Sequence, residues 1–531
     1  MVVSSEPNSS QAGIQILKKG GNAVDAAVAV GFALAVTFPQ AGNIGGGGFM
    51  VIRFSDGTTT TLDYREKAPA KAWKEMFLDG KGNYVPEKSQ EGYLSCGVPG
   101  SVAGMLLAQK KYGKLTREQV LQPAIKLAQE GFMINKPFAE DLNFALKNFR
   151  KYPGTRKTCS RDGKPYKQGE MFIQTELAKT LRRIAQKGTE GFYKGETARL
   201  IIAEMNRGKG LITFDDLFDY QAIERPALIG NYRGYEIISM GPPSSGGILL
   251  IQLLNLLEKY DISSMGRVSV PTVSVMAEAM KLAYADRAEF LGDPDFVKVP
   301  VKDLISKTYA DERRALIDPL VPKPSNEVSP GTIPAEREET THYSVIDRWG
   351  NTVSTTTTLN GSFGSGIVVE GAGFFLNNEM DDFSAKPGAP NMYGVIGKEA
   401  NAIHPHKRML SSMTPTIVLR NHQPFLVLGS PGGSTIITTV LEVILNIIDH
   451  HMDLLEAVDA PRIHHQWLPD TLRYERSALT QEVQRELVRR GFDLSERQGS
   501  QGRVEAIMID STKGWYYGAS DRRGYGKAAG Y

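Results

Sequence analysis

The chain has 531 residues, of which 41% are hydrophobic and 23% charged, which is typical of a soluble globular protein. Its 62 basic residues nearly balance its 59 acidic residues, and a net charge of +3 gives no reason to expect nucleic-acid or membrane-surface binding. Two cysteines, Cys96 and Cys159, exclude a disulfide framework and a cysteine-rich metal site. The most apolar stretch, residues 23–36, is too short to span a bilayer, so no membrane span is expected.

The first expected elements are helices. Residues 12–19 have a helical pattern that Ser9 or Ser10 can cap, and an alanine-rich helix over residues 23–36 can be capped by Asn22. The glycine-rich residues that follow miss the spacing of a dinucleotide-binding loop. Two strands then form a hairpin over residues 49–54 and 58–64.

Residues 98–220 have a mainly helical pattern, and a loop rich in proline and glycine, residues 241–247, opens a helix over 248–259. Residues 318–339 are rich in proline, end in acidic residues and have no apolar periodicity, so we expect an exposed, mobile connector. The elements expected after it are a β-hairpin over 340–347 and 351–359, strands over 416–419 and 425–428, and a helix over 436–448.

The abrupt change from the acidic connector to a strand that begins with Thr340 allows two interpretations. By local pattern, Thr340 is a solvated strand-forming residue. Alternatively, it attacks the carbonyl of Glu339, cuts the chain and gains a free α-amine. That amine has an ordinary pKa of about 7.7–8.0 and can act as a base for the weakly nucleophilic threonine hydroxyl. All eight histidines lie at or after His342, so the preceding chain supplies no histidine base.

The sequence around Thr340 resembles the start of the small subunit of γ-glutamyltranspeptidases, which are autoprocessing N-terminal-nucleophile hydrolases. The resemblance spans nearly the whole chain in order. It is carried by residues 20–27, 64–69, 340–347, 358–360, 363–366, 376–383, 410–413, 429–434 and 518–521.

The resemblance implies catalytic roles for four residues. Thr340 matches the nucleophile of both self-cleavage and acyl transfer, with the cut between Glu339 and Thr340. Thr358 matches the neighbour whose hydroxyl contacts the nucleophile, although a threonine there also suits a plain strand. Gly432 and Gly433 match the oxyanion-hole pair, although they also suit a tight turn. Glycine lets backbone N–H groups closely approach a tetrahedral intermediate.

A γ-glutamyl donor carries a free α-carboxylate and a free α-amine, and the resemblance implies residues for both. Arg65 suits the carboxylate because its planar fork binds bidentately, and Asp382 suits the ammonium. Alone, each is typical of a surface charge. The other matching positions are Asn360, Glu379, Ser411 and Ser412.

Two residues and one loop differ among members of the family. Glu379 stands where some members have glutamine, and Arg522 stands where members often have proline. Residues 386–394 resemble a lid loop that some relatives lack, and Tyr393 in it is expected to close over the glutamyl pocket. The alternative for this loop is a solvated surface turn.

The resemblance implies a four-layer αββα sandwich cut into a large chain, residues 1–339, and a small chain, residues 340–531, that stay together. It implies no cofactor and no metal. The expected substrates are glutathione or related γ-glutamyl amides as donors, with water, an amino acid or a dipeptide as acceptor. Family members are usually periplasmic or secreted, but residues 1–6 have no signal-peptide pattern, so the compartment stays open.

Two other functions remain open. A cephalosporin (glutaryl) acylase on the same scaffold would bind a group without an α-amine and would gain nothing from Asp382 and Glu379. A non-catalytic binding protein would not need Thr340, Gly432 and Gly433.

Overall fold

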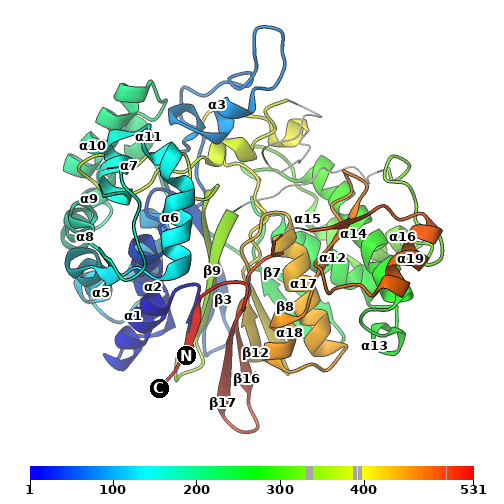
Figure 1. The fold of residues 1–531 in the computed structure, drawn as a ribbon. Helices are drawn as coiled ribbons and strands as arrows, with labels where there is room; N and C mark the ends of the chain where they lie inside the picture. The colour runs from blue at the N-terminus through cyan, green and yellow to red at the C-terminus, as the bar shows by residue number, and fades with distance from the viewer. Residues whose placement is uncertain (162, 330–338, 387–391, 393–397, 498) are drawn as a thin grey trace.

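The computed structural model describes residues 1–161, 163–329, 339–386, 392, 398–497 and 499–531. Two antiparallel sheets lie face to face in the middle of the molecule, and helices cover the outer face of each (Figure 1). This arrangement is the four-layer αββα sandwich that the sequence predicts. Both chain termini lie at the same edge, where the first and last strands pair.

The first sheet has seven strands and carries the start of the predicted small chain at its centre. In spatial order they are β18 (Lys527–Ala529), β1 (Val2–Ser4), β9 (Glu339–Ile346), β10 (Thr352–Asn360), β2 (Gly47–Arg53), β3 (Thr59–Asp63) and β6 (Ile223–Arg225).

The second sheet has six strands from both halves of the chain. In spatial order they are β17 (Trp515–Ser520), β16 (Glu505–Asp510), β12 (Gln423–Leu428), β11 (Thr416–Arg420), β8 (Tyr235–Ser239) and β7 (Leu228–Tyr232). Two small sheets lie outside the sandwich. They contain β4 (Phe132–Met133) and β5 (Met171–Phe172), and β13 (Ile463–His464), β14 (Leu472–Tyr474) and β15 (Leu494–Glu496).

The helices divide into two groups, one beside each sheet (Figure 1). Beside the first sheet lie α1 (Pro7–Lys18), α2 (Ala23–Thr37), α4 (Ser101–Tyr112), α5 (Arg117–Glu130), α6 (Lys136–Phe149), α7 (Pro153–Cys159), α8 (Thr175–Lys187), α9 (Glu190–Tyr193), α10 (Gly195–Gly208) and α11 (Phe214–Phe218). Beside the second lie α12 (Gly246–Leu257), α13 (Ile262–Met265), α14 (Val270–Phe290), α15 (Val301–Leu304), α16 (Lys307–Arg314), α17 (Thr435–Ile448), α18 (Leu454–Asp459) and α19 (Gln481–Arg490). The short α3 (Pro86–Gln90) and the 3₁₀ turns η1 (Tyr93–Ser95), η2 (Glu379–Asp382) and η3 (Glu399–Asn401) connect these parts.

The alternation of side chains along the strands explains the four layers. Along β2, Met50 and Ile52 point into the core shared with the first helical group, whereas Phe49 and Val51 point into the core between the sheets. Along β11, Ile417 belongs to the core between the sheets and Val418 to the core shared with the second helical group. Since the strands are apolar on both faces, each sheet is buried on both sides.

Most predicted elements are observed with small shifts at their ends. Asn22 caps α2 in a reciprocal capping box with Asp25. The predicted caps of the first helix, Ser9 and Ser10, are wrong. The helix begins at Pro7, and the carboxylate of Glu6 accepts a hydrogen bond from the Ser9 N–H at 3.0 Å.

The connector is packed in part, contrary to the exposure expected for residues 318–339. Ser325 and Val328 are buried, and the Ser325 N–H and hydroxyl each donate to Asp470 at 2.7 Å. The indole N–H of Trp467 donates to the Ser325 carbonyl at 2.8 Å. These partners lie more than 140 positions away, so local composition could not predict them. Residues 330–338 lie outside the described part of the chain.

No helix among the described residues is long and apolar enough to cross a membrane. The apolar residues 23–36 belong to α2, which is buried throughout.

Candidate active site

Thr340 lies in β9 directly opposite Thr358 of β10. Both residues are completely buried. The Thr340 hydroxyl makes no hydrogen bond to any described residue, whereas the Thr358 hydroxyl accepts one from the Asn360 N–H at 2.8 Å. The register of β9 and β10 shifts between Thr358 and Asn360. The predicted nucleophile and its predicted neighbour are therefore paired, and the nucleophile has a buried hydroxyl available for reaction.

The glycine-rich residues after α2 allow β2 to lie close to Thr358. Gly47 pairs with Thr358 in the sheet, and a Cβ atom on Gly46 would lie 2.1 Å from the Thr358 carbonyl oxygen. The Asn43 side-chain amide donates to the same carbonyl at 2.7 Å. The glycines thus serve close backbone packing at the site.

Arg65, predicted to bind the donor carboxylate, lies with the two acids predicted to bind the donor ammonium. Its guanidinium donates to the carboxylates of Glu379 and Asp382, and these three side chains are buried. Glu66 lies 3.5 Å from the same guanidinium. The structure therefore gathers one cation and several carboxylates at a buried point between β3 and η2.

Backbone carbonyls and one asparagine hold this group in place. The Arg65 guanidinium also donates to the carbonyls of Met409, at 3.2 Å, and Leu410, at 3.0 Å. Asn401 donates from its side-chain amide to the Asp382 carbonyl at 2.7 Å and accepts from the Leu410 N–H at 3.0 Å. Asn401 thus connects Asp382 to Leu410, whose carbonyl accepts from Arg65. The sequence analysis did not predict this role.

Ser411 and Ser412 follow directly and are held by the proline- and glycine-rich loop. The Ser411 carbonyl accepts from the N–H and the hydroxyl of Ser245, both at 2.7 Å. Arg287, a buried residue of α14, donates to the Ser245 hydroxyl at 2.7 Å and to the Ser412 hydroxyl at 3.1 Å. Sequence reasoning also missed Arg287, because its helical pattern carries no sign of a site partner more than a hundred residues away.

Asn360 occupies the end of β10 with a backbone φ of 70°, a left-handed conformation that asparagine tolerates. Its side-chain amide donates to the Asn378 carbonyl at 3.0 Å, and its side-chain oxygen has no hydrogen-bond partner among the described residues. An unpartnered buried acceptor beside Thr358 suits an ammonium or N–H donor.

Gly432 and Gly433 lie in the loop between β12 and the N-terminus of α17. Their φ angles are 134° and 65°, which favour glycine, and a Cβ on Gly432 would lie 2.6 Å from the Thr435 hydroxyl. The Ser354 hydroxyl of β10 donates to the Leu428 carbonyl at 3.1 Å, which places the start of this loop beside the strand of Thr358.

Tyr393 lies outside the described residues, as do most of residues 386–394, so the lid interpretation stays a prediction. Met392 is described, and its sulfur lies 3.8 Å from the side-chain amide nitrogen of Asn360.

The adjacent residues His464 and His465 contact different partners. His464 contacts the hydroxyls of Ser434 and Thr438, and His465 lies 3.3 Å from Asp470. The described residues contain no cluster of three or more potential metal ligands.

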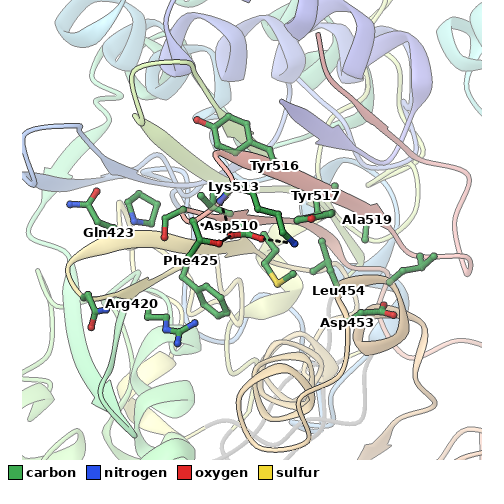
Figure 2. Close-up of a pocket in the computed structure, with 18 residues that line it drawn as sticks. Arg420, Gln423, Phe425, Asp453, Leu454, Asp510, Lys513, Tyr516, Tyr517 and Ala519 are labelled. Carbon is green, nitrogen blue, oxygen red and sulfur yellow. Dashed lines mark hydrogen bonds and ion pairs between the residues drawn. The ribbon is translucent and has the colours of Figure 1, made fainter.

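None of these residues lines a hollow of about 1070 Å³ (Figure 2). Phe425, Tyr516, Tyr517, Asp510 and Lys513 are among its lining residues. It adjoins the start of β12, whereas Gly432 follows the end of that strand. The candidate active site is therefore the group around Thr340 and Arg65, not this hollow.

The αββα sandwich and the buried threonine in a central strand are the arrangement of N-terminal-nucleophile hydrolases. Residues 9–531 match the family described as Gamma-glutamyltranspeptidase, and the chain belongs to this family. It is 50% identical over 525 residues to the glutathione hydrolase proenzyme of Escherichia coli (strain K12), covering 98% of this chain and 90% of that relative.

Solved structures that are similar to it include a γ-glutamyltranspeptidase and a cephalosporin acylase. The γ-glutamyltranspeptidase of Helicobacter pylori is 50% identical with a TM-score of 0.61, over 62% of this chain and 94% of that one. The cephalosporin acylase of Bacillus halodurans is 30% identical with a TM-score of 0.88, over 99% of this chain and 95% of that one.

Proposed function

We propose that the chain is an autoprocessing γ-glutamyltranspeptidase that uses Thr340 to take the γ-glutamyl group of glutathione or related γ-glutamyl amides and passes it to water, an amino acid or a dipeptide. The observation that carries the proposal is the buried hydroxyl of Thr340, which lies opposite Thr358 and has no hydrogen-bond partner among the described residues. The proposed products of maturation are a large chain, residues 1–339, and a small chain, residues 340–531.

Maturation begins with attack of the Thr340 hydroxyl oxygen on the carbonyl carbon of Glu339. The peptide C–N bond breaks, the hydroxyl proton moves to the Thr340 nitrogen, and an ester replaces the amide. Water then hydrolyses the ester, leaving a carboxylate on Glu339 and a free α-amine and hydroxyl on Thr340. The reaction generates the base that the next reaction requires.

In each catalytic cycle the Thr340 amine accepts the hydroxyl proton while the oxygen attacks the γ-carbonyl of the donor. The C–N bond of the donor breaks, and its amine leaves with that proton. Water or the amine of an acceptor then attacks the γ-glutamyl ester and releases Thr340. The proposed base belongs to the nucleophile itself, so this scheme uses no cofactor and no metal.

Arg65, Glu379 and Asp382 suit the head of the donor through an exchange of ion pairs. With no donor, the guanidinium is paired with the two carboxylates. A bound donor brings one carboxylate for Arg65 and one ammonium for Glu379 and Asp382, so every charge keeps an opposite partner. A buried charge left unpaired would be costly, and this favours a zwitterionic head over a simple acid. Asn360, Ser411 and Ser412 are proposed to supply further hydrogen bonds.

Gly432 and Gly433 are proposed to stabilise the negative oxygen of the tetrahedral intermediate with their backbone N–H groups. They precede α17, a helix of 14 residues, so its N-terminus adds a favourable dipole. Donors of this kind contribute about 3–4 kcal/mol to the transition state.

A glutaryl acylase is the rival activity, and the similarity to a cephalosporin acylase gives it weight. Its substrate would bring a carboxylate to Arg65 but no ammonium to Glu379 and Asp382. These two acids would then lose their partner without receiving another, which disfavours this activity.

Turnover of γ-glutamyl-p-nitroanilide with and without glycylglycine tests the proposal. We expect release of p-nitroaniline by the purified protein, faster release when glycylglycine is added, and no release by Thr340→Ala. Hydrolysis of glutaryl-p-nitroanilide at an equal or higher rate would favour the acylase instead.

A further inference from the structure

His342 is a buried titratable residue that the proposed mechanism does not use, and it lies on the same face of β9 as Thr340. Successive side chains of a strand alternate between faces, so Thr340, His342 and Ser344 point to one side. Their partners across β10 are Thr358, Thr356 and Ser354. The Ser344 hydroxyl reaches the Glu505 carbonyl of β16, so this face points toward the second sheet.

The hydrogen bonds around His342 fix its tautomer. The Ser344 hydroxyl donates its only proton to backbone carbonyls, Glu505 at 2.9 Å and Val427 at 3.3 Å, so it accepts from His342 Nε2–H at 3.1 Å. His342 Nδ1 then carries no proton and accepts from the Thr356 hydroxyl at 2.9 Å. The result is one continuous chain of hydrogen bonds from β10 through β9 to β16.

The imidazole also packs against the start of the loop that carries Gly432 and Gly433. A Cβ atom on Gly429 would lie 2.4 Å from both Cε1 and Nδ1 of His342. Gly429 is therefore a glycine because the ring occupies the space of a side chain. The Gly429 carbonyl accepts from the Glu505 N–H at 3.2 Å, so the residue that receives the hydrogen-bond chain also holds the loop.

The ring thus touches three structures that the proposed reaction needs. It lies two residues from Thr340, its partner Thr356 lies two residues from Thr358, and Gly429 lies three residues before Gly432. We infer that His342 is a positioning residue that holds the nucleophile strand, the strand of Thr358 and the Gly429–Gly433 loop in register as the chain is cut and as each donor reacts.

This role differs from that of a proton carrier. Both ring nitrogens are already engaged with neutral hydroxyl groups, and neither reaches Thr340 through a described hydrogen bond. Burial lowers the pKa of His342 to about 3, so the ring stays neutral in the working pH range. A strand end normally frays, and cleavage would make Thr340 such an end, so a fixed anchor two residues further on has a physical purpose.

The inference rests on the proposed function, and its test uses pairs of matched variants of the full chain. Thr356→Val removes the donor to His342 and keeps the side-chain shape. Thr341→Val makes the same change at a buried threonine on the opposite face of β9, where the hydroxyl donates to Ser5 at 2.9 Å. His342→Gln and Gly429→Ala both disturb the packing of the His342 ring against Gly429, one from each side of the contact.

For Thr356→Val, His342→Gln and Gly429→Ala we expect kcat to fall about tenfold to a hundredfold, with the donor KM changed less than about threefold, since small misplacement of reacting groups has effects of this size. Self-cleavage should slow in the same variants. Thr341→Val should keep kcat within about twofold. The shape of the kcat–pH profile should be retained, because a positioning residue does not titrate with the reaction.

The inference is overturned if Thr356→Val and Thr341→Val reduce kcat equally, or if His342→Gln removes one limb of the pH profile. Thr356→Val is the smallest change and keeps the test decisive if His342→Gln does not fold. Activity in Thr340→Ala would instead overturn the proposed function, so the two failures are distinguishable.

Discussion

Thr340 and Thr358 stand directly opposite each other in the β9–β10 pair, one with a hydroxyl that no described residue engages and the other with a hydroxyl bound to the Asn360 N–H. The two hydroxyls therefore differ in how strongly their orientation is restrained by hydrogen bonds. Thr358 is restrained next to the bulge at Asn360, whereas Thr340 can turn toward a carbonyl. Thr355 of β10 also has a buried hydroxyl without a partner among the described residues, so what distinguishes Thr340 is its place at the start of β9, next to Glu339.

Self-cleavage is the first prediction. The purified protein should separate on a denaturing gel into two pieces, about two-thirds and one-third of the chain, with Thr340 at the new N-terminus. Thr340→Ala should remain one chain because it has no hydroxyl to attack Glu339, and Thr340→Ser should cut more slowly. N-terminal sequencing checks the site, and cutting of Thr340→Ala at this bond would disprove self-processing.

The second prediction concerns the ammonium of the donor. Asp382→Asn should raise the KM for γ-glutamyl-p-nitroanilide about tenfold to a hundredfold, because a charge-assisted hydrogen bond contributes about 1.5–3 kcal/mol. Glutaryl-p-nitroanilide, which lacks the ammonium, should be affected far less. Equal losses with both substrates would remove Asp382 from the ammonium site.

The third prediction concerns the proposed contact between Arg65 and the α-carboxylate of the donor. Arg65→Lys retains the charge but loses the planar fork, so the KM for γ-glutamyl-p-nitroanilide should rise about tenfold or more while self-cleavage stays complete. The control is Arg199→Lys, a change at an exposed helical residue whose ion pair with Glu196 is on the surface. An unchanged KM in Arg65→Lys would contradict its assignment.

Gly432 provides the fourth prediction, through a matched pair of glycines. Gly432→Ala and Gly499→Ala both place alanine at a positive φ, but only at Gly432 does the new Cβ meet a neighbour, the Thr435 hydroxyl. Both should lose about 1 kcal/mol or more of stability. Only Gly432→Ala should lower kcat by about a hundredfold, the size expected for a displaced oxyanion donor. Equal kcat values in the two variants would argue against the oxyanion role.

The fifth prediction concerns stability against pH. Burial raises the pKa of Glu442 in α17 to about 8, above its ordinary value of 4.5. Between these pH values the folded state holds a proton that the unfolded chain has released. This group therefore contributes stability at low pH that is lost as the pH rises toward 8, by up to about 1.4 kcal/mol per pH unit.

Glu442→Gln stays neutral and still accepts a hydrogen bond from the Ile463 N–H, which lies 3.2 Å from Oε1 in the wild type. Its free energy of unfolding should therefore fall less steeply between pH 5 and pH 8 than that of the wild type. Urea unfolding of the uncut Thr340→Ala background at several pH values makes the comparison for a single chain. Parallel pH curves for the two proteins would contradict the buried-proton interpretation.

Asn401 shows what sequence reasoning could not reach. It links Asp382 to Leu410, whose carbonyl holds Arg65, yet it is one asparagine in a 3₁₀ turn with no pattern around it. Arg287 is similar, because its contact with Ser412 joins a helix to a loop 125 positions away. Both residues act through contacts distant in sequence, and such contacts leave no local periodicity to read.

The sequence by itself determined the elements around the candidate site, such as the β9–β10 hairpin and α17, because alternation and helical spacing report which faces are apolar, and the match from residue 9 to residue 531 shows the family. It also singled out Thr340, because a strand that starts after an acidic, proline-rich connector is unusual. Only the tertiary structure decided that Arg65 is paired with Glu379 and Asp382, that Ser325 is anchored by Asp470, and that the His342 ring contacts Thr356, Ser344 and Gly429. The physical reason is that hydrogen bonds and ion pairs depend on which distant segments the two sheets bring together, and the sandwich sets those distances only once it is folded.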